Sequence, residues 1–258
     1  MIVEQTLEKL VKMKLATMAK SLQERLSRSD HSDLSQSDFI GLIVDDEWIH
    51  RENRRMGTLI KSAAFKDKEA CLESIDYSVS RGIKKSVMLE LGQNHWINKH
   101  QNILITGPSG SGKSYLAQAL SSHACRSGYS CGYYRVSRLA QTLSQSRADG
   151  SYAKLLKKLS KCRVLILDDF GISKITVEQR NDILEILEDR YRQGSTIITS
   201  QLSVQEWHPY LGGERVADAI CDRIVHNSHR IEVSSIESLR KKEEEKNEKH
   251  VEIKKQNQ

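Results

Sequence analysis

Apolar residues near the start of the chain recur at intervals of three and four positions. They are Leu7, Val11, Leu15, Met18, Leu22 and Leu26. This spacing puts one apolar side chain per turn on a common face, so it predicts an amphipathic helix. Polar residues at 27–37 interrupt the pattern. Ser35 and Asp38 then form a helix-start signal, and we expect a second helix running toward Trp48 and a third extending to Ala64.

The middle of the chain alternates between short apolar runs and helical patterns. The runs that we expect to be β-strands are 102–106, 131–134, 164–167 and 195–199. Short apolar runs of this kind, bounded by turn residues, are typical of strands buried in a parallel sheet. Thr176 and Gln179 form a signal for the start of one intervening helix, which Gly194 is expected to end. The pattern predicts an α/β fold of three layers with a parallel central sheet.

The same patterns divide the chain into three parts. Residues 1–70 are expected to form a small all-α domain. Residues 71–235 are expected to form the α/β domain, and the mixed apolar runs at 65–101 are interpreted as the connector that leads into it. Residues 236–258 carry few apolar side chains and are expected to be a solvated helix or a charged tail.

Composition narrows the class of protein. Charged residues make up 29% of the chain and apolar residues 38%, which suits a folded protein with an ionised surface. We expect no membrane association and a cytoplasmic location, because the sequence has no run of about 18 apolar residues and no signal-peptide pattern. The five cysteines are scattered without metal-binding spacing, so free thiols are expected. A net charge of +6 permits binding to a polyanion such as DNA.

A phosphate-binding motif follows the expected strand 102–106. Its residues are Gly107, Pro108, Ser109, Gly110, Ser111, Gly112, Lys113 and Ser114, and Tyr115 completes the ATP-binding set that we predict. The match to GxxxxGK[ST] lies between a strand and a helix, which disfavours the alternative of a simple glycine-rich turn. Backbone N–H groups of such a loop surround phosphate, Lys113 reaches the β- and γ-phosphates, and Ser114 offers a hydroxyl to Mg²⁺. The cofactors predicted are therefore ATP and Mg²⁺.

Two carboxylates follow the expected strand 164–167. We assign Asp168 to the Mg²⁺ shell together with Ser114, and Asp169 to orienting or deprotonating the attacking water. The carboxyl edge of a parallel sheet is where ligands of α/β proteins bind, which favours this interpretation. A solvated turn at the end of the strand is the alternative.

Two further polar residues are candidates for catalysis. Gln201 follows the strand 195–199, and we predict that it senses the γ-phosphate, with Ser200 as a second choice; capping of the strand end is the alternative. Arg223 lies on a partly apolar helix, and we predict that it reaches the ATP of a neighbouring subunit. The alternative for Arg223 is an ion pair with Asp222 or Asp218 on its own helix.

Basic residues gather in two places that are candidates for DNA contact. One is the segment 144–163 with Arg147, Lys154, Lys157, Lys158 and Lys161, and the other is Arg54 and Arg55 in the N-terminal helices, beside Arg51. Either cluster is also compatible with an ordinary solvated surface. Neither suggests base recognition, so binding to duplex DNA is expected to be largely independent of sequence and weakened by salt.

Several strings of the chain resemble one family of ATPases. They are 188–191, 195–202 with Trp207, and 219–231, together with 52–55 and 101–102. They are similar to the IstB-type helper ATPases of bacterial insertion sequences, which are relatives of the DnaC and DnaI helicase loaders within the AAA+ class.

This resemblance implies a homo-oligomer that assembles on duplex DNA with ATP and recruits or stimulates a transposase. It matches Arg223 to the arginine-finger position and Arg240 to a second nucleotide sensor, and Asp169 stands where glutamate is usual. The alternative function is a replicative helicase loader that acts as a nucleotide-gated adaptor. A small-molecule kinase is disfavoured by Gln201 and Arg223.

Overall fold

The computed structural model describes residues 2–27, 34–77, 82–213 and 215–234. By their internal contacts the residues divide into two compact units, Met1–Thr58 and Leu59–Gln258. The boundary falls within one long helix, so residues 59–70, which we expected in the helical domain, belong to the second unit. Arg240 lies outside the described residues.

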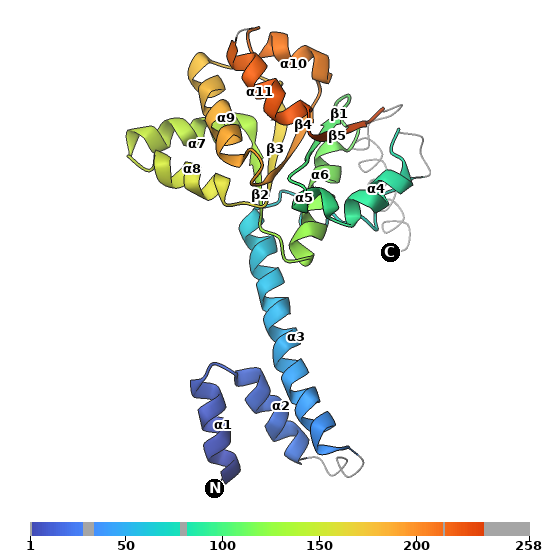
Figure 1. Cartoon of the computed structure of the whole chain (residues 1–258), viewed down its shortest axis with the longest axis vertical. Helices are drawn as coiled ribbons and strands as arrows, with labels where there is room; N and C mark the ends of the chain where they lie inside the picture. The colour runs from blue at the N-terminus through green and yellow to red at the C-terminus, as the bar shows by residue number, and fades with distance from the viewer. Residues whose placement is uncertain (1, 28–33, 78–81, 214, 235–258) are drawn as a thin grey trace, which may run out of the picture. The chain divides into compact units, whose positions relative to one another are not determined.

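The first unit is all helical (Figure 1). It contains α1 (Ile2–Lys12), α2 (Ala16–Ser27) and most of α3 (Gln36–Ala63). The expectation of one amphipathic helix through Leu26 is wrong, because the chain turns between α1 and α2. Lys14 adopts a left-handed conformation with φ of 61°, and the N–H of Leu15 donates to the carbonyl of Leu10 at 2.9 Å. This is the Schellman pattern that ends helices.

Polar contacts join α2 to α3. The hydroxyl of Ser21 and the guanidinium of Arg25 both donate to Asp46, and the backbone N–H of Met18 donates to Glu47 at 2.9 Å. Glu47 is buried, so its charge depends on its own donors, the N–H of Met18 and the guanidinium of Arg51. The packing of α2 against α3 therefore depends on the ionised carboxylates of Asp46 and Glu47.

The helix α3 is continuous where we expected two helices. Its start is as predicted, since the N–H of Asp38 donates to the hydroxyl of Ser35 at 3.1 Å. No proline interrupts residues 36–63, and the change from apolar to basic residues near Trp48 alters the exposed face rather than the helix.

The second unit is built on a parallel five-stranded sheet. Its strands are β1 (Asn102–Thr106), β2 (Cys131–Arg135), β3 (Val164–Phe170), β4 (Ser195–Ser200) and β5 (Ser228–Glu232), in the order β2-β3-β4-β1-β5. Every neighbouring pair is parallel. The four expected strands are confirmed, whereas β5 was not predicted. It is an edge strand, and only Ile231 of its five residues is buried, so its apolar signal is weak.

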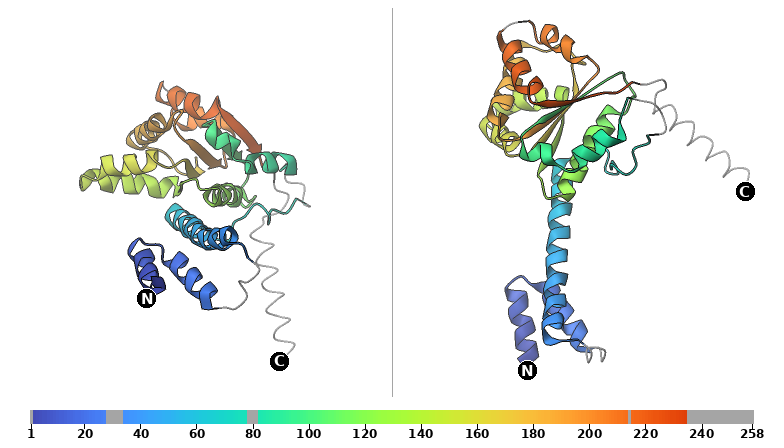
Figure 2. Two further views of the ribbon diagram at one scale, coloured as in Figure 1. Left: turned by 60° about the horizontal axis from the view of Figure 1, so that its bottom comes forward. Right: turned by 45° about the vertical axis from the view of Figure 1, so that its right-hand side comes forward.

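Helices cover both faces of this sheet (Figure 2). They are α4 (Lys85–Gly92), α5 (His95–Asn98), α6 (Lys113–Arg126), α7 (Val136–Ala148), α8 (Tyr152–Ser160), α9 (Val177–Arg190), α10 (Val204–Tyr210) and α11 (Arg215–Val225). Two of these, α4 and α5, lie in the stretch that we interpreted as a connector. The helix-start signal at Thr176 is confirmed as a capping box of α9, but α9 ends at Arg190 rather than at Gly194.

Alternate residues along the strands point into two separate cores. Ile103, Ile105, Ile166 and Ile197 pack with α4, α5 and α6, whereas Leu104, Leu165, Leu167 and Ile198 pack with α7 to α11. A strand points successive side chains to opposite faces, so a continuously apolar strand needs cover on both sides. The three-layer α/β fold with a parallel central sheet is confirmed.

Two further expectations are tested by the described residues. All five cysteines are free thiols. Among the helices of residues 2–27, 34–77, 82–213 and 215–234, none has the length and apolar character needed to cross a membrane.

Candidate nucleotide-binding site

The phosphate-binding motif forms the turn between β1 and α6. Gly107 directly follows β1 with φ of 148°, and a Cβ atom there would lie 2.0 Å from the carbonyl oxygen of Val233. Only glycine fits this close approach. Gly112 has φ of 93° and is the N-cap of α6, so α6 begins at Lys113 without a side-chain cap. The strand and helix therefore hold the loop as the motif predicts.

Several polar groups of this loop suit an anion. The first-turn N–H groups of α6 carry no side-chain cap, and a helix N-terminus attracts negative charge. The hydroxyl of Ser111 is buried and has no hydrogen-bond partner among the described residues. Lys113 is buried, and its Nζ donates to the carbonyl of Pro108 at 2.7 Å, which keeps the amine beside the loop. These groups fit a polyphosphate.

The carboxylate of Asp168 ties three strands and α6 together. It accepts hydrogen bonds from Ser114 at 2.7 Å, from Tyr133 at 2.6 Å and from Thr199 at 2.5 Å. Asp168 is only 1% exposed. Burial of the Tyr133 phenol and its hydrogen bond to Asp168 raise the pKa of Tyr133, so the phenol remains a donor. Two of the groups that we assigned to Mg²⁺, Ser114 and Asp168, are thus in direct contact.

This pair also fits the donor set of magnesium. Mg²⁺ prefers oxygen ligands, and proteins commonly hold it with one or two side chains while phosphate and water complete the shell. A hydroxyl and a carboxylate at the mouth of the phosphate-binding loop match that requirement. The residues present therefore fit ATP with Mg²⁺.

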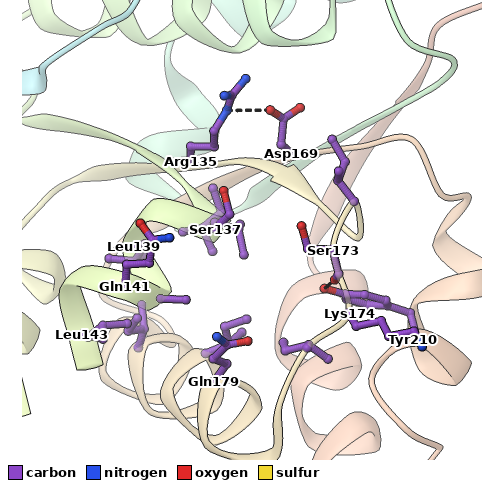
Figure 3. Close-up of a pocket in the computed structure, with 17 residues that line it drawn as sticks. Arg135, Ser137, Leu139, Gln141, Leu143, Asp169, Ser173, Lys174, Gln179 and Tyr210 are labelled. Atoms are coloured by element: carbon purple, nitrogen blue, oxygen red, sulfur yellow. Dashed lines mark hydrogen bonds and ion pairs between the residues drawn. The ribbon is translucent and has the colours of Figure 1, made fainter. Parts of the chain in front are cut away.

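The neighbouring carboxylate, Asp169, has an unusual backbone. Its φ is 63°, and the register between β3 and β4 is irregular between Leu167 and Phe170. A left-handed conformation costs a residue with a side chain on the order of 1–3 kcal/mol, and such strain clusters at functional sites. Arg135, at the end of β2, holds the Asp169 carboxylate with a 2.8 Å contact (Figure 3).

The contact between Arg135 and Asp169 separates two cavities. On one side lies a cleft of about 570 Å³ lined by the phosphate-binding loop, Asp168 and Gln201. On the other side lies an apolar cavity of about 450 Å³, drawn in Figure 3, between α7, α9 and the loop that follows β3. Arg135 and Asp169 line both cavities, so a ligand bound in either cavity would lie beside this ion pair.

A segment far from the motif completes the cleft. Residues 66–69 line it, and the N–H of Asp67 donates to Oε1 of Gln118 at 2.8 Å. Nε2 of Gln118 in turn donates to the carbonyl of Ser114 at 3.0 Å. The hydroxyl of Tyr115 contacts the backbone of Cys71, so Tyr115 joins this segment to α6 while its side chain also lines the cleft.

Of the two candidates at the end of β4, Ser200 and Gln201, only Gln201 lines the cleft. Gln201 is exposed and lines the cleft, as a γ-phosphate sensor requires. The hydroxyl of Ser200 is buried, donates to the carbonyl of Phe170 at 2.7 Å and accepts from the N–H of Leu202. Ser200 therefore shapes the strand end.

Arg223 lies away from the phosphate-binding loop of its own chain. Its carbonyl accepts from the side chain of Asn102, the first residue of β1, whereas the loop follows the last residue of β1. Five strand residues separate the two edges by roughly 13 Å at about 3.3 Å per residue. The Arg223 guanidinium pairs with Glu188 on α9, not with Asp222 or Asp218.

The basic candidates in segment 144–163 differ in their surroundings. Arg147 pairs with Asp182 and Glu178 and stacks 4.1 Å from the ring centroid of Tyr152, so its charge is used within the unit. The Asp182 contact raises the pKa of Arg147.

The lysines are arranged differently. Lys154, Lys157, Lys158 and Lys161 recur at intervals of three and four and are all exposed, whereas Leu156 and Leu159 are buried. They form one basic face, the α8 lysine face. In the first unit, Arg54 and Arg55 are exposed, and Arg55 lies 3.7 Å from Glu52.

Sequence reasoning missed four residues that hold the site. They are Tyr133, Arg135, Thr199 and Gln118. The sequence places Tyr133 and Arg135 at the end of an expected strand, but their contacts with Asp168 and Asp169 require β2 to lie next to β3. The order of the strands in the sheet could not be predicted from the sequence pattern.

The chain matches the family model described as IstB-like ATP binding protein over residues 8–247. An ATP-binding protein assigned to an insertion sequence of Sinorhizobium fredii is 44% identical over 246 residues, which is 95% of this chain and 100% of that protein. The fold is similar to the crystal structure of DnaI, with a TM-score of 0.55, 21% identity, and coverage of 64% of this chain and 91% of that chain. It is also similar to the DnaC helicase loader, with a TM-score of 0.54, 21% identity, and coverage of 64% and 96%.

Proposed function

Because this chain belongs to the family of IstB-like ATP-binding proteins, we propose that it is a Mg²⁺-dependent ATPase that assembles on duplex DNA and recruits or stimulates a transposase. The observation that carries the proposal is the contact of Ser114 with Asp168 beside the strained Asp169, in one cleft with Lys113. We further propose that it acts in the cytoplasm.

In this proposal the chain's own groups divide the work of hydrolysis. Lys113 and the loop amides neutralise the phosphates, and Ser114 with Asp168 would hold Mg²⁺, which supplies positive charge to the phosphate oxygens when bound. Asp169 accepts the proton of the attacking water, and Gln201 contacts the γ-phosphate. The strained backbone of Asp169 supports its role, because such strain clusters at functional sites and Asp169 lines the cleft.

Turnover is proposed to need a second copy of the chain. Arg223 lies at the opposite edge of the sheet from its own phosphate-binding loop, so within one subunit it does not reach that ATP. An arginine from a neighbouring subunit that neutralises transition-state charge is a common solution for this chemistry. The proposal is therefore a homo-oligomer in which Arg223 acts across an interface, with Arg240 as a further nucleotide contact.

Duplex DNA is proposed to contact the α8 lysine face. Four exposed lysines on one side of a short helix contact phosphates without reading bases. Arg54 and Arg55 of the first unit are proposed as additional phosphate contacts, whereas Arg147 is proposed to act mainly in holding α7 to α9.

The first unit is proposed to bind the transposase. Ile40, Val44 and Trp48 recur every four residues on α3 and are 61%, 46% and 65% exposed. Exposed apolar residues in a contiguous stripe indicate a site of protein contact.

One titration tests the central claim. Duplex DNA is titrated with the full chain in the presence of ATP, ADP or no nucleotide, each at two salt concentrations. ATP is expected to give the tightest binding, and higher salt is expected to weaken it. Equal DNA affinity in all three nucleotide states would contradict an ATP-driven assembly.

The alternative, a replicative helicase loader, is favoured by the fold shared with the DnaC helicase loader. The two functions differ in what the DNA-bound chain does. A transposition helper is expected to raise strand transfer by the transposase encoded beside it, whereas a loader is expected to bind a replicative helicase without any effect on strand transfer.

A further inference from the structure

The apolar cavity beside the ATP cleft has the size of a ligand site. It lies between α7, α9 and residues 172–175 of the loop that follows β3, and its volume is about 450 Å³ (Figure 3). We call it the α7–α9 cavity. Ligand sites commonly have volumes of roughly 300–1,000 Å³, whereas ordinary protein interiors hold few voids larger than a water molecule. The cavity is therefore a candidate site for a small molecule.

The loop that forms one wall of the α7–α9 cavity is fixed at both ends. The Tyr210 hydroxyl donates to the carbonyl of Ser173 at 2.8 Å, and the centroid of the Tyr210 ring lies 5.4 Å from that of Phe170, the last residue of β3. At the other end, the capping box of Thr176 and Gln179 starts α9. The wall is thus formed without a ligand, as is usual for small-molecule sites.

The other walls favour an apolar ligand body. They come from α7, β3 and α9, and their buried aliphatic side chains are Leu139, Leu143, Leu167, Ile183 and Ile186. Water beside such side chains lacks hydrogen-bond partners, so apolar cavities bind apolar molecules in preference to water. Each methylene group that moves from water to these walls stabilises the complex.

The charged groups of the α7–α9 cavity favour an anion at its mouth. Arg135 and Asp169 pair with each other, so together they add no net charge to the lining. Lys174 also lines the cavity, and it makes no ion pair with any described residue. Lys174 and Ile172 are exposed, which places the mouth at this loop, and Figure 3 shows Lys174 on the loop side of the cavity.

We propose that the α7–α9 cavity binds a small apolar carboxylate, with Lys174 as the residue that binds its anionic group, and that the bound ligand lowers ATP turnover. The ligand's apolar body lies against the aliphatic walls. A free small molecule suits the site better than a protein segment, because several elements bound the cavity. The effect on turnover rests on the proposed function, since it requires hydrolysis that uses Asp169.

The ion pair of Arg135 and Asp169 links the α7–α9 cavity to hydrolysis. Both residues line this cavity and the ATP cleft. The cavity has its present form while Arg135 contacts the Asp169 carboxylate, so a ligand that fits this form stabilises the contact. The oxygen that Arg135 holds is not available to the attacking water. Occupation of the cavity is therefore expected to slow hydrolysis.

The binding test uses octanoate and the full chain without nucleotide. Calorimetric titration is expected to show one site, and hexanoate is expected to bind roughly 10- to 15-fold more weakly, because it buries two fewer methylene groups. Ala140→Phe puts a ring at a position that lines the cavity and should abolish binding. The matched control is Ala148→Phe, which adds the same ring at an exposed position of α7 outside the lining.

The anionic group is tested separately, at an exposed position that tolerates substitution. Lys174→Ala should weaken octanoate binding roughly two- to five-fold, the range of a solvent-exposed ion pair, and should leave binding of 1-octanol unchanged. Lys99→Ala removes an exposed lysine at the end of α5 and should change neither affinity.

Turnover then tests the link to hydrolysis. Octanoate should lower steady-state ATP turnover of the wild-type chain with the same midpoint as its binding. Turnover of Ala140→Phe should not respond, because the ligand is excluded. Arg135→Ala should still bind octanoate, but its turnover should not respond, because the contact with Asp169 is gone.

Each part of the proposal has an outcome that would overturn it. Absence of octanoate binding, or equal binding by Ala140→Phe and the wild-type chain, would overturn the site. Equal weakening of octanoate and 1-octanol binding by Lys174→Ala would overturn the carboxylate. Octanoate binding without a change in turnover would overturn the effect on hydrolysis. Absence of turnover in the wild-type chain without octanoate would instead contradict the proposed function, whereas the binding titrations do not depend on turnover.

Discussion

The guanidinium of Arg135, at the end of β2, lies 2.8 Å from the carboxylate of Asp169, at the end of β3. The contact occupies a carboxylate oxygen of Asp169. While Arg135 holds Asp169, that oxygen is therefore not free to contact an attacking water.

This relationship predicts the effect of Arg135→Ala. Turnover of ATP without DNA is expected to rise about two- to five-fold, because a partly exposed pair of this kind is worth roughly 0.5–1 kcal/mol. Steady-state phosphate release checks it, with Arg138→Ala on α7 as the control. A fall in turnover would mean that Arg135 instead positions Asp169 for catalysis.

Two substitutions in the cleft should separate binding from hydrolysis. Lys113→Ala is expected to weaken ATP binding by roughly ten- to a hundred-fold, because a hydrogen bond to a charged group is worth about 1.5–3 kcal/mol. Asp169→Asn is expected to bind ATP normally and to lose about 10²–10⁴-fold in turnover, the usual contribution of a general base. Equilibrium binding of a fluorescent ATP analogue and single-turnover rates measure the two effects. Unchanged ATP affinity in Lys113→Ala would show that the loop assignment is wrong.

The α8 lysine face predicts a change in salt dependence. The combined change Lys154→Gln, Lys157→Gln and Lys158→Gln is expected to reduce the slope of log affinity against log salt by about 2–3, since each phosphate contact contributes about 0.9. DNA titrations at several salt concentrations measure the slope. The control replaces the exposed Lys84, Lys85 and Lys99, which lie in and beside α4 and α5, with the same loss of charge. Equal slopes for both variants would contradict the proposal that DNA contacts the α8 lysine face.

The contact between Arg147 and Asp182 predicts a stability effect. The side chain of Asp182 is 3% exposed and otherwise accepts from the hydroxyl of Tyr152, so Arg147→Ala leaves a buried charge with one neutral donor. The free energy of unfolding is expected to fall by roughly 2–4 kcal/mol, below the largest values for buried pairs because Arg147 is partly exposed. Urea denaturation checks this. A midpoint equal to that of Arg138→Ala would contradict it.

Acid is expected to loosen the first unit. Bonds from Ser21 and Arg25 lower the pKa of Asp46, and for Glu47 the raising effect of burial is outweighed by the donors Met18 and Arg51. Both pKa values lie below their ordinary values of 3.8 and 4.5, so the unfolded chain takes up protons first. The stabilisation is present above those values and is lost as pH falls through the lower pKa values of the folded state.

The N–H resonance of Met18 reports this loss. Its chemical shift should titrate with a midpoint below 4.5, the ordinary pKa of Glu47, and Glu47→Gln should abolish the change. A midpoint at or above that value would contradict the cited direction of the shift.

Local patterns determined much of this protein. The phosphate-binding loop is encoded by glycines close together in the sequence, because Gly110 and Gly112 adopt positive φ angles of 76° and 93° that favour glycine. The strands β1, β3 and β4 are buried along almost their whole length because both faces of the sheet are covered. The short apolar runs at their centres were therefore enough to predict them. Asp168 and Asp169 followed from their place at a strand end.

Local patterns failed where the structure depends on distant partners. The edge strand β5 has one buried residue, so its sequence resembles a polar turn. Arg147 resembles a DNA contact in a basic stretch until Asp182, 35 positions away, is placed beside it. The sequence offers Asp222, Asp218 or the ATP of a neighbouring subunit as the partner of Arg223. In the fold, Arg223 pairs with Glu188.

The sequence by itself determined the ATP-binding loop, the two carboxylates and the layered α/β class, because each rests on residues adjacent in the chain. Tertiary structure decided which side chains hold those carboxylates and where the cations lie. Tyr133, Arg135 and Thr199 reach Asp168 and Asp169 only because β2, β3 and β4 are neighbours in the sheet. Strand order arises from the packing of the whole unit, and no short segment encodes it.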